Sequence, residues 1–119
     1  MSTANKFRDL KVWQKSMVFV TDIYKKTQNS PKDERFGLTS QIRRSSVSVP
    51  SNIAEGFGRR LPKEFKHFLR ISISSLFELQ TQLEICKNIE LIDPNIFAQY
   101  FENSREIERM LKSLISSVK

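Results

Sequence analysis

The residues that most often carry out chemistry in proteins are scarce in this chain. It contains one histidine, His67, and one cysteine, Cys86. A catalytic Cys–His pair needs both side chains within hydrogen-bond reach. The two positions fall in one predicted helix, well over two turns apart, so they cannot meet within the chain. Cys86 falls in the apolar stripe along which its predicted helix would pack against other helices, so it is predicted to be a small buried hydrophobe. His67 is predicted to be a solvated surface residue.

The sequence does not indicate a site for a metal or a phosphate-bearing cofactor. No Cys or His residues have the spacing of a zinc site. A di-iron site in a helical bundle needs paired Glu-x-x-His motifs, and Glu64 with His67 is the single instance here. Gly56-Phe57-Gly58 is too short for a phosphate-binding loop and does not follow a strand. We therefore predict that the protein is not an enzyme and has no catalytic residues, cofactor, metal or small-molecule substrate.

Basic residues offer the remaining chemistry, which is contact with phosphate. Lys and Arg number 20 against 13 Asp and Glu, which gives a formal net charge of +7 and a pI near 9.8. This balance favours polyanionic partners such as nucleic acid or a ribosomal surface, but a soluble basic protein without an anionic ligand fits it equally well. A cluster of basic residues is the first candidate for nucleic-acid contact: Arg59, Arg60, Lys63, Lys66 and Arg70.

Three members of this cluster recur at steps of three and four, so Lys63, Lys66 and Arg70 share one helical face. A positive stripe near a helix N-terminus suits phosphates, because the free backbone donors there also favour anions. The alternative is an ordinary solvated face, and the pattern alone does not choose between the two. Phe57 and Phe65 could stack on bases, but a core role is the stronger prediction for both.

A second unusual stretch runs from Gln41 to Gly56, and two interpretations compete for it. Val47 and Val49 alternate with serines, which is the period of a strand. Because the flanking sequence is helical, we instead predict a helix with Pro50 inside it and a kink there. Serines 45, 46 and 48 would let a neighbouring helix come close. Six residues at steps of three and four would form one helical face: Leu38, Ile42, Ser45, Val49, Ile53 and Gly56.

Two adjacent arginines in this stretch, Arg43 and Arg44, are a second candidate for nucleic-acid contact. Neighbouring positions on a helix point about 100° apart, so both cannot face the same partner. One could pair with Glu34, with Glu55 or with a carboxylate of another subunit, while the other reaches solvent or a ligand. We assign a structural or oligomer-forming role to the rest of the stretch, through Gln41, Pro50, Asn52, Glu55 and Gly56.

Four amphipathic segments must position these residues. Their apolar side chains recur at alternating steps of three and four, as in helices packed against other helices, over about 9–27, 31–57, 62–90 and 94–118. Asp9, Ser30 and Asp93 are the predicted N-caps. Four long helices with short connections make one all-α domain, 1–119, an antiparallel up-down-up-down four-helix bundle. The first and third helices carry more apolar residues than one seam needs, which suggests self-association.

The composition also bears on location. A single cysteine excludes an internal disulfide and fits a reducing compartment. The N-terminus is polar rather than signal-like, and no apolar run approaches the roughly 20 residues of a membrane span. We therefore expect a soluble, cytoplasmic protein without membrane contact.

Several blocks of the sequence resemble one known family. They are Phe7-x-x-Leu10-x-Val12-Trp13-Gln14, Ile23-Tyr24-x-x-Thr27, Glu34-Arg35-Phe36-Gly37-Leu38-x-x-Gln41-Ile42-Arg43-Arg44, Ser48-Val49-Pro50-Ser51-Asn52-Ile53-Ala54-Glu55-Gly56, Glu64-Phe65-x-x-Phe68-Leu69 and Glu78-Leu79-x-x-Gln82-Leu83. The pattern is similar to that of bacterial four-helix-bundle proteins encoded in intervening sequences of 23S ribosomal RNA genes, a family that includes accessory proteins of diversity-generating retroelements. One departure is Ser72-Ile73-Ser74-Ser75, where the family often has Ala and Gly.

This resemblance implies a ring-like homo-oligomer, with a pentamer expected, that presents basic surface to RNA or to a nucleic-acid-handling protein. Retroelement members of the family bind a reverse transcriptase and its RNA. We therefore expect a non-enzymatic nucleic-acid-binding protein. The second hypothesis is a structural oligomer that binds a protein partner without touching nucleic acid, and the excess apolar residues support it.

Overall fold

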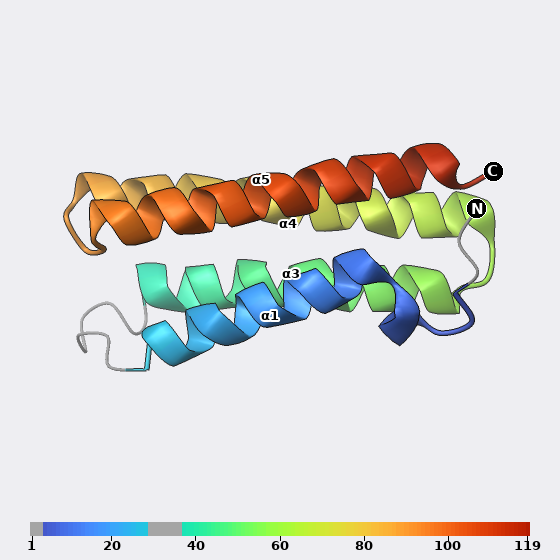
Figure 1. Ribbon diagram of the computed structural model, residues 1–119, viewed down its shortest axis with the longest axis horizontal. Helices are drawn as coiled ribbons and strands as arrows, with labels where there is room; N and C mark the ends of the chain where they lie inside the picture. The colour runs from blue at the N-terminus through green and yellow to red at the C-terminus, as the bar shows by residue number, and fades with distance from the viewer. Residues whose placement is uncertain (1–3, 29–36) are drawn as a thin grey trace.

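The computed structural model describes residues 4–28 and 37–119, and the regular structure in these ranges is entirely helical (Figure 1). The predicted all-α four-helix bundle is confirmed. Val47 and Val49 lie inside a helix, which excludes the strand interpretation. The described elements are a short 3₁₀ turn and four α-helices: η1 (Phe7–Asp9), α1 (Lys11–Lys26), α3 (Leu38–Gly58), α4 (Pro62–Asn88) and α5 (Pro94–Ser117).

Each helix packs against two neighbours and lies diagonally across from the remaining one. The contacting pairs are α1 with α3, α3 with α4, α4 with α5 and α5 with α1. Successive helices run in opposite directions, and the bundle measures 44 × 22 × 19 Å. The α3–α4 connection lies at the same end of the bundle as η1 and the end of α5 (Figure 1).

The core lies along the axis of the bundle and draws on all four helices. Burying one aliphatic side chain of this kind stabilises the fold by about 1.5–3 kcal/mol. The large side chains that are fully buried are Ile23, Ile53, Leu69, Leu76, Leu79, Ile107, Leu111 and Val49.

Pro50 lies inside α3, as predicted, and the helix continues through it. Proline has no N–H, so the carbonyl of Ser46 loses its usual donor one turn later, at a cost of about 3 kcal/mol. Pro50 and Ser46 are both buried, so packing of this part of α3 against its neighbours offsets the cost. The kink expected at Pro50 stays a prediction.

The helix ends agree with the sequence in one place and differ in another. Asp93 caps α5, with its Oδ1 accepting from the Asn95 backbone N at 2.7 Å. Asp9 is not the N-cap of α1, because it lies in η1 and accepts there from the Lys6 backbone N at 3.3 Å. Leu10 takes the N-cap position instead, without a side-chain hydrogen bond.

Within the described residues, α3 corresponds to the second predicted helix. Gly37 is the N-cap of α3 and Leu38 its first residue. The predicted start near residue 31, together with the predicted cap at Ser30, lies outside the described residues. So does Glu34, one of the carboxylates considered as a partner for the arginine pair.

Candidate nucleic-acid interface

The predicted basic cluster starts at the tight connection between α3 and α4. α3 ends at Gly58, Arg59 is its C-cap, and Arg60 takes a left-handed backbone conformation with φ 67°. Glycine is favoured at such a position, and another residue costs roughly 1–2 kcal/mol there. The turn brings the chain directly into α4, where Pro62 occupies the first turn and needs no N–H partner.

Arg59 is occupied by local partners. Its Nη2 lies 2.9 Å from Oε2 of Glu55 and its Nη1 lies 3.8 Å from Oε1 of Glu64. The guanidinium also lies over the ring of Phe68, 5.0 Å from its centroid. Arg59 therefore neutralises the two carboxylates nearest to it in sequence and offers less free charge than the sequence suggested.

The other helical members of the cluster are not neutralised. Lys63, Lys66 and Arg70, which we call the α4 cation row, make no ion pair within the described residues. Lys63 and Arg70 are exposed, and Lys66 is half-buried. The N-cap of α4, Leu61, supplies no side-chain hydrogen bond, so first-turn backbone donors stay available to an anion. The α4 cation row and the N-terminus of α4 are thus both positive.

The two aromatic residues beside this row pack into the protein. Phe57 and Phe65 meet edge to face, with ring centroids 5.7 Å apart, and both are partly buried against the core. The geometry agrees with the core role predicted for them. The Arg60 guanidinium carbon lies 6.0 Å from the Phe57 ring centroid, on the exposed side of this pair.

Arg43, from the second candidate, is fixed against the end of α1. Its Nε donates to Oγ1 of Thr27 at 2.7 Å, and its Nη2 donates to the Tyr24 carbonyl at 3.0 Å. The guanidinium stacks on the Tyr24 ring, 4.5 Å from its centroid. A cation is favoured at a helix C-terminus, where carbonyls lack partners. The pairing with Glu55 that the sequence allowed does not form.

Arg44 points elsewhere, as expected for adjacent helical positions. It is exposed and makes no ion pair within the described ranges. It lines a shallow hollow together with Tyr24, Arg43 and Val47. The structure therefore separates the arginine pair into one internal group and one surface group.

The small residues of the Gln41–Gly56 stretch bring α3 and α4 into close contact. Gly56 is buried, and a Cβ added there would lie 2.5 Å from Cβ of Phe68. Glycine is therefore needed for the spacing between the helices. Ser72 of α4, which is fully buried, donates its hydroxyl to the Val49 carbonyl at 2.9 Å.

Polar side chains continue this contact toward the other end of the bundle. Ser45 donates to Oε1 of Gln82 at 2.7 Å, and both residues are buried. The hydroxyls of Ser48 and Ser75 lie 2.9 Å apart, and Asn52 donates to the Ser48 carbonyl at 2.8 Å. The Asn52 bond lies within α3, Glu55 pairs with Arg59, and Gln41 is exposed, so the structural or oligomer-forming role assigned to these residues stays a prediction.

Sequence reasoning named Gln82 and Ser75 only in the family comparison and assigned neither of them a buried hydrogen bond. One signal was available, because both lie on α4 at the spacing of its apolar seam, yet both are polar. Polar residues at such positions must find partners when buried. Among the described residues, no buried side-chain nitrogen or oxygen is left without one.

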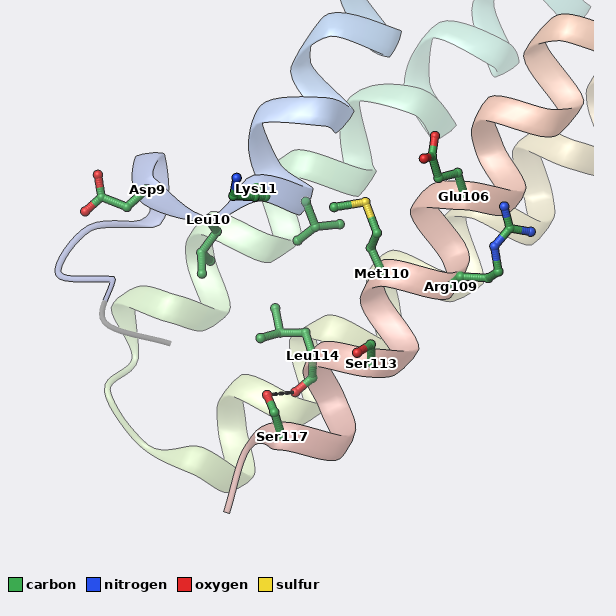
Figure 2. Close-up of a pocket in the computed structure, with 10 residues that line it drawn as sticks. Asp9, Leu10, Lys11, Glu106, Arg109, Met110, Ser113, Leu114 and Ser117 are labelled. Atoms are coloured by element: carbon green, nitrogen blue, oxygen red, sulfur yellow. Dashed lines mark hydrogen bonds between the residues drawn. The ribbon is translucent and has the colours of Figure 1, made fainter. Parts of the chain in front are cut away.

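A separate groove of about 720 Å³ opens between the start of α1 and the last turns of α5 (Figure 2). Leu10 on one side and Met110 and Leu114 on the other form its apolar walls. Its charged residues are of both signs, with Glu106 and Arg109 side by side on α5. It therefore does not extend the cationic surface.

Among the described residues, no three His, Cys, Asp or Glu side chains lie together in a way that could hold a metal ion. None of the described helices combines the length and the apolar character that crossing a membrane requires.

Comparison with known proteins agrees with this architecture. The chain matches the sequence model of the family described as 23S rRNA-intervening sequence protein over residues 8–113. It is also similar to the crystal structure of a protein with unknown function from the S23 ribosomal protein family of Bacteroides thetaiotaomicron. The two chains are 28% identical, with a TM-score of 0.80, over 89% of this chain and 96% of that one. Among curated proteins, none matches significantly. The chain therefore belongs to the 23S rRNA-intervening sequence protein family.

Proposed function

We propose that this protein is a non-enzymatic, basic, homo-oligomeric helical bundle that binds RNA or another nucleic acid through the α4 cation row. The observation that carries the proposal is that no carboxylate of residues 4–28 or 37–119 forms an ion pair with the row. The neighbouring carboxylates, Glu55 and Glu64, are both held by Arg59. The row is therefore free to meet phosphates.

Three further features support this assignment. The chain has a formal net charge of +7, which draws polyanions toward it over a long range. Arg60 is exposed beside the row and makes no ion pair within the described residues. The row begins in the first turn of α4, where helix geometry favours anions. A protein that itself handles nucleic acid, such as a reverse transcriptase, is a partner compatible with the same surface.

Binding of single-stranded RNA, measured by filter retention between about 50 and 200 mM salt, tests the proposal. The variant is Lys63→Gln/Lys66→Gln. Each phosphate neutralised on a single strand contributes roughly 0.7 to the slope of log affinity against log salt, so the slope should fall by about 1.4. Affinity should weaken for every RNA sequence alike, because phosphates carry no sequence information.

The matched control is Arg109→Gln/Lys112→Gln, which removes the same charge from two α5 cations that already have carboxylate partners. It should change the salt slope much less. The proposal is overturned if the wild type has no measurable affinity at low salt, or if the control loses as much as the row variant.

A structural scaffold that binds only protein is the second candidate, and a specific observation favours it. Val18 on α1 is 72% exposed, Phe77 and Ile85 on α4 are 45% and 43% exposed, and Ile89, the C-cap of α4, is 56% exposed. Ile85 and Ile89 lie four positions apart, so they lie on the same side at the end of α4. Such faces are typical of contacts between subunits.

Sedimentation velocity measures the assembly, for which five subunits are expected from the family resemblance. Ile85→Glu/Ile89→Glu should dissociate an assembly built on this α4 face. If Lys63→Gln/Lys66→Gln leaves assembly and partner capture intact and the wild type binds no RNA, the scaffold is the better description.

A further inference from the structure

A pocket beside the α3–α4 connection, which we call the end pocket, has the dimensions of a small-molecule site. Its volume is about 320 Å³, at the lower end of the roughly 300–1,000 Å³ found for ligand sites. It is adjacent to the groove of Figure 2 and shares Leu10, Leu114 and Ser117 with it. Phe57 of α3 and Phe65 of α4 complete its apolar walls.

The charged side chains at the end pocket are of one sign. They belong to Arg60 and Lys119, and none of the described lining residues is Asp or Glu. Ser117 directs its hydroxyl hydrogen to the Leu114 carbonyl at 2.7 Å, which leaves its oxygen as an acceptor (Figure 2). An occupant that suits this lining has an apolar body and a negative head group.

Arg60 is placed for the head group. It follows the C-cap of α3 in a left-handed conformation, φ 67°, as Glu90 does after the C-cap of α4, so this backbone ends the helix. The Arg60 side chain lines the pocket. A guanidinium presents parallel N–H groups that match a carboxylate, and that of Arg60 forms no ion pair within the described chain.

We propose that the end pocket binds a small amphipathic carboxylate, with its hydrocarbon part against Phe57, Phe65 and Leu114 and its carboxylate on Arg60. The volume of about 320 Å³ equals that of roughly ten water molecules in the liquid, so a straight chain of roughly eight carbons fits. Arg60 belongs to both proposals, but Lys63, Lys66 and Arg70 do not line the pocket, so Lys63→Gln/Lys66→Gln should leave this binding unchanged.

Calorimetric titration of the full chain with octanoate, octanol and octylamine, all below their micellar concentrations, tests the proposal without any mutation. Octanoate should bind at least tenfold more tightly than octanol, and octylamine should not bind, because Arg60 repels it. Hexanoate should bind roughly fifteenfold more weakly than octanoate, since each methylene is worth about fourfold. Equal binding of octanoate and octanol, or no binding of octanoate at millimolar concentration, overturns the proposal.

Two variants locate the site. Arg60→Gly relieves the backbone and keeps the fold, so octanoate should bind only as weakly as octanol does. Leu114→Trp fills the pocket and should abolish binding of both. Lys25→Ala removes an exposed cation of α1, at the far end of the bundle, and should change neither affinity. Unchanged octanoate affinity in Arg60→Gly would place the ligand elsewhere and overturn the assignment.

Discussion

The α3–α4 and α1–α5 seams join neighbouring helices of one bundle but are built from opposite kinds of side chain. Between α3 and α4 the residues are small, and their hydroxyls bond inside the protein, as with Ser72 and the Val49 carbonyl at 2.9 Å. Between α1 and α5 the residues are long, and Lys15 reaches Glu106 at 2.7 Å with both side chains substantially exposed. The first seam is closed, whereas the second leaves the groove of Figure 2 open.

The difference shows which of the two contacts fixes the relative position of its helices more strictly. Leaving a buried hydroxyl without its partner costs about 1–3 kcal/mol, so α3 and α4 fit in one register. An exposed ion pair contributes little and is screened by salt, so it restricts the position of α1 on α5 only weakly. The α4 cation row is therefore carried by the better-defined half of the molecule.

The largest effect is expected from Gly56→Ala, because the new Cβ would lie 2.5 Å from Cβ of Phe68 and push α3 and α4 apart. Overpacking of this kind should destabilise the protein by about 3 kcal/mol. The measurement is the free energy of unfolding in urea. Gly58→Ala is the control, since nothing lies within 4 Å of a Cβ there, and it should be neutral or stabilising by about 0.5–1 kcal/mol. Similar losses in both variants would mean that helix spacing is not set at Gly56.

The next effect concerns the buried pair Ser45–Gln82, whose side chains bond at 2.7 Å. Gln82→Leu should destabilise the fold by about 1–2 kcal/mol, because the Ser45 hydroxyl loses its shorter bond and keeps only the Ile42 carbonyl, at 3.2 Å. Ser45→Ala/Gln82→Leu should recover part of that loss, since the buried hydroxyl is then removed. Additive losses in this double-mutant cycle would contradict the coupling.

On the α1–α5 side, Tyr100→Phe removes a hydroxyl that donates to Oδ2 of Asp22 at 2.8 Å. A loss of about 1 kcal/mol is expected at neutral pH. Burial, and then the bond to Asp22, raise the pKa of Tyr100 above its ordinary value of 10.0. A raised pKa means that the contribution is fully present below pH 10 and is lost as the pH rises further. Thermal unfolding from pH 7 to pH 11 should show the two proteins converge, and a constant difference would contradict this account.

The smallest effect is expected from Glu106→Gln, also between α1 and α5. The hydrogen bond from Lys15 lowers the pKa of the Glu106 carboxyl. A lowered pKa gives stability that is present above the unfolded value and lost as the pH falls through the folded one. Because the group is exposed, the unfolding temperature at neutral pH should stay within error of the wild type. A clear loss that persists in high salt would show that this seam is stronger than its exposure implies.

Much of the fold was predictable because it follows from periodicity along single helices. The apolar spacing placed the helices, the Asp93-Pro94 pair marked the start of α5, and the small residues of α3 indicated a close neighbour. The partners of Arg43, Arg59 and Asp9 were not predictable in this way. A helical wheel gives the direction of a side chain from its own axis, but what it meets depends on the offset and rotation of the next helix. Asp9 lies in the 3₁₀ turn η1 and accepts a hydrogen bond from the Lys6 backbone N, so it does not cap α1.

The hold of Arg43 on the last turn of α1 bears on how this protein tolerates insertion. Two donors from one guanidinium fasten α3 to Thr27 and to the Tyr24 carbonyl. The two helices are thus joined directly by side chains of residues outside the stretch between Gln28 and Gly37. Sequence inserted between these two positions, a reporter domain for example, would leave the Arg43 contacts themselves unaltered.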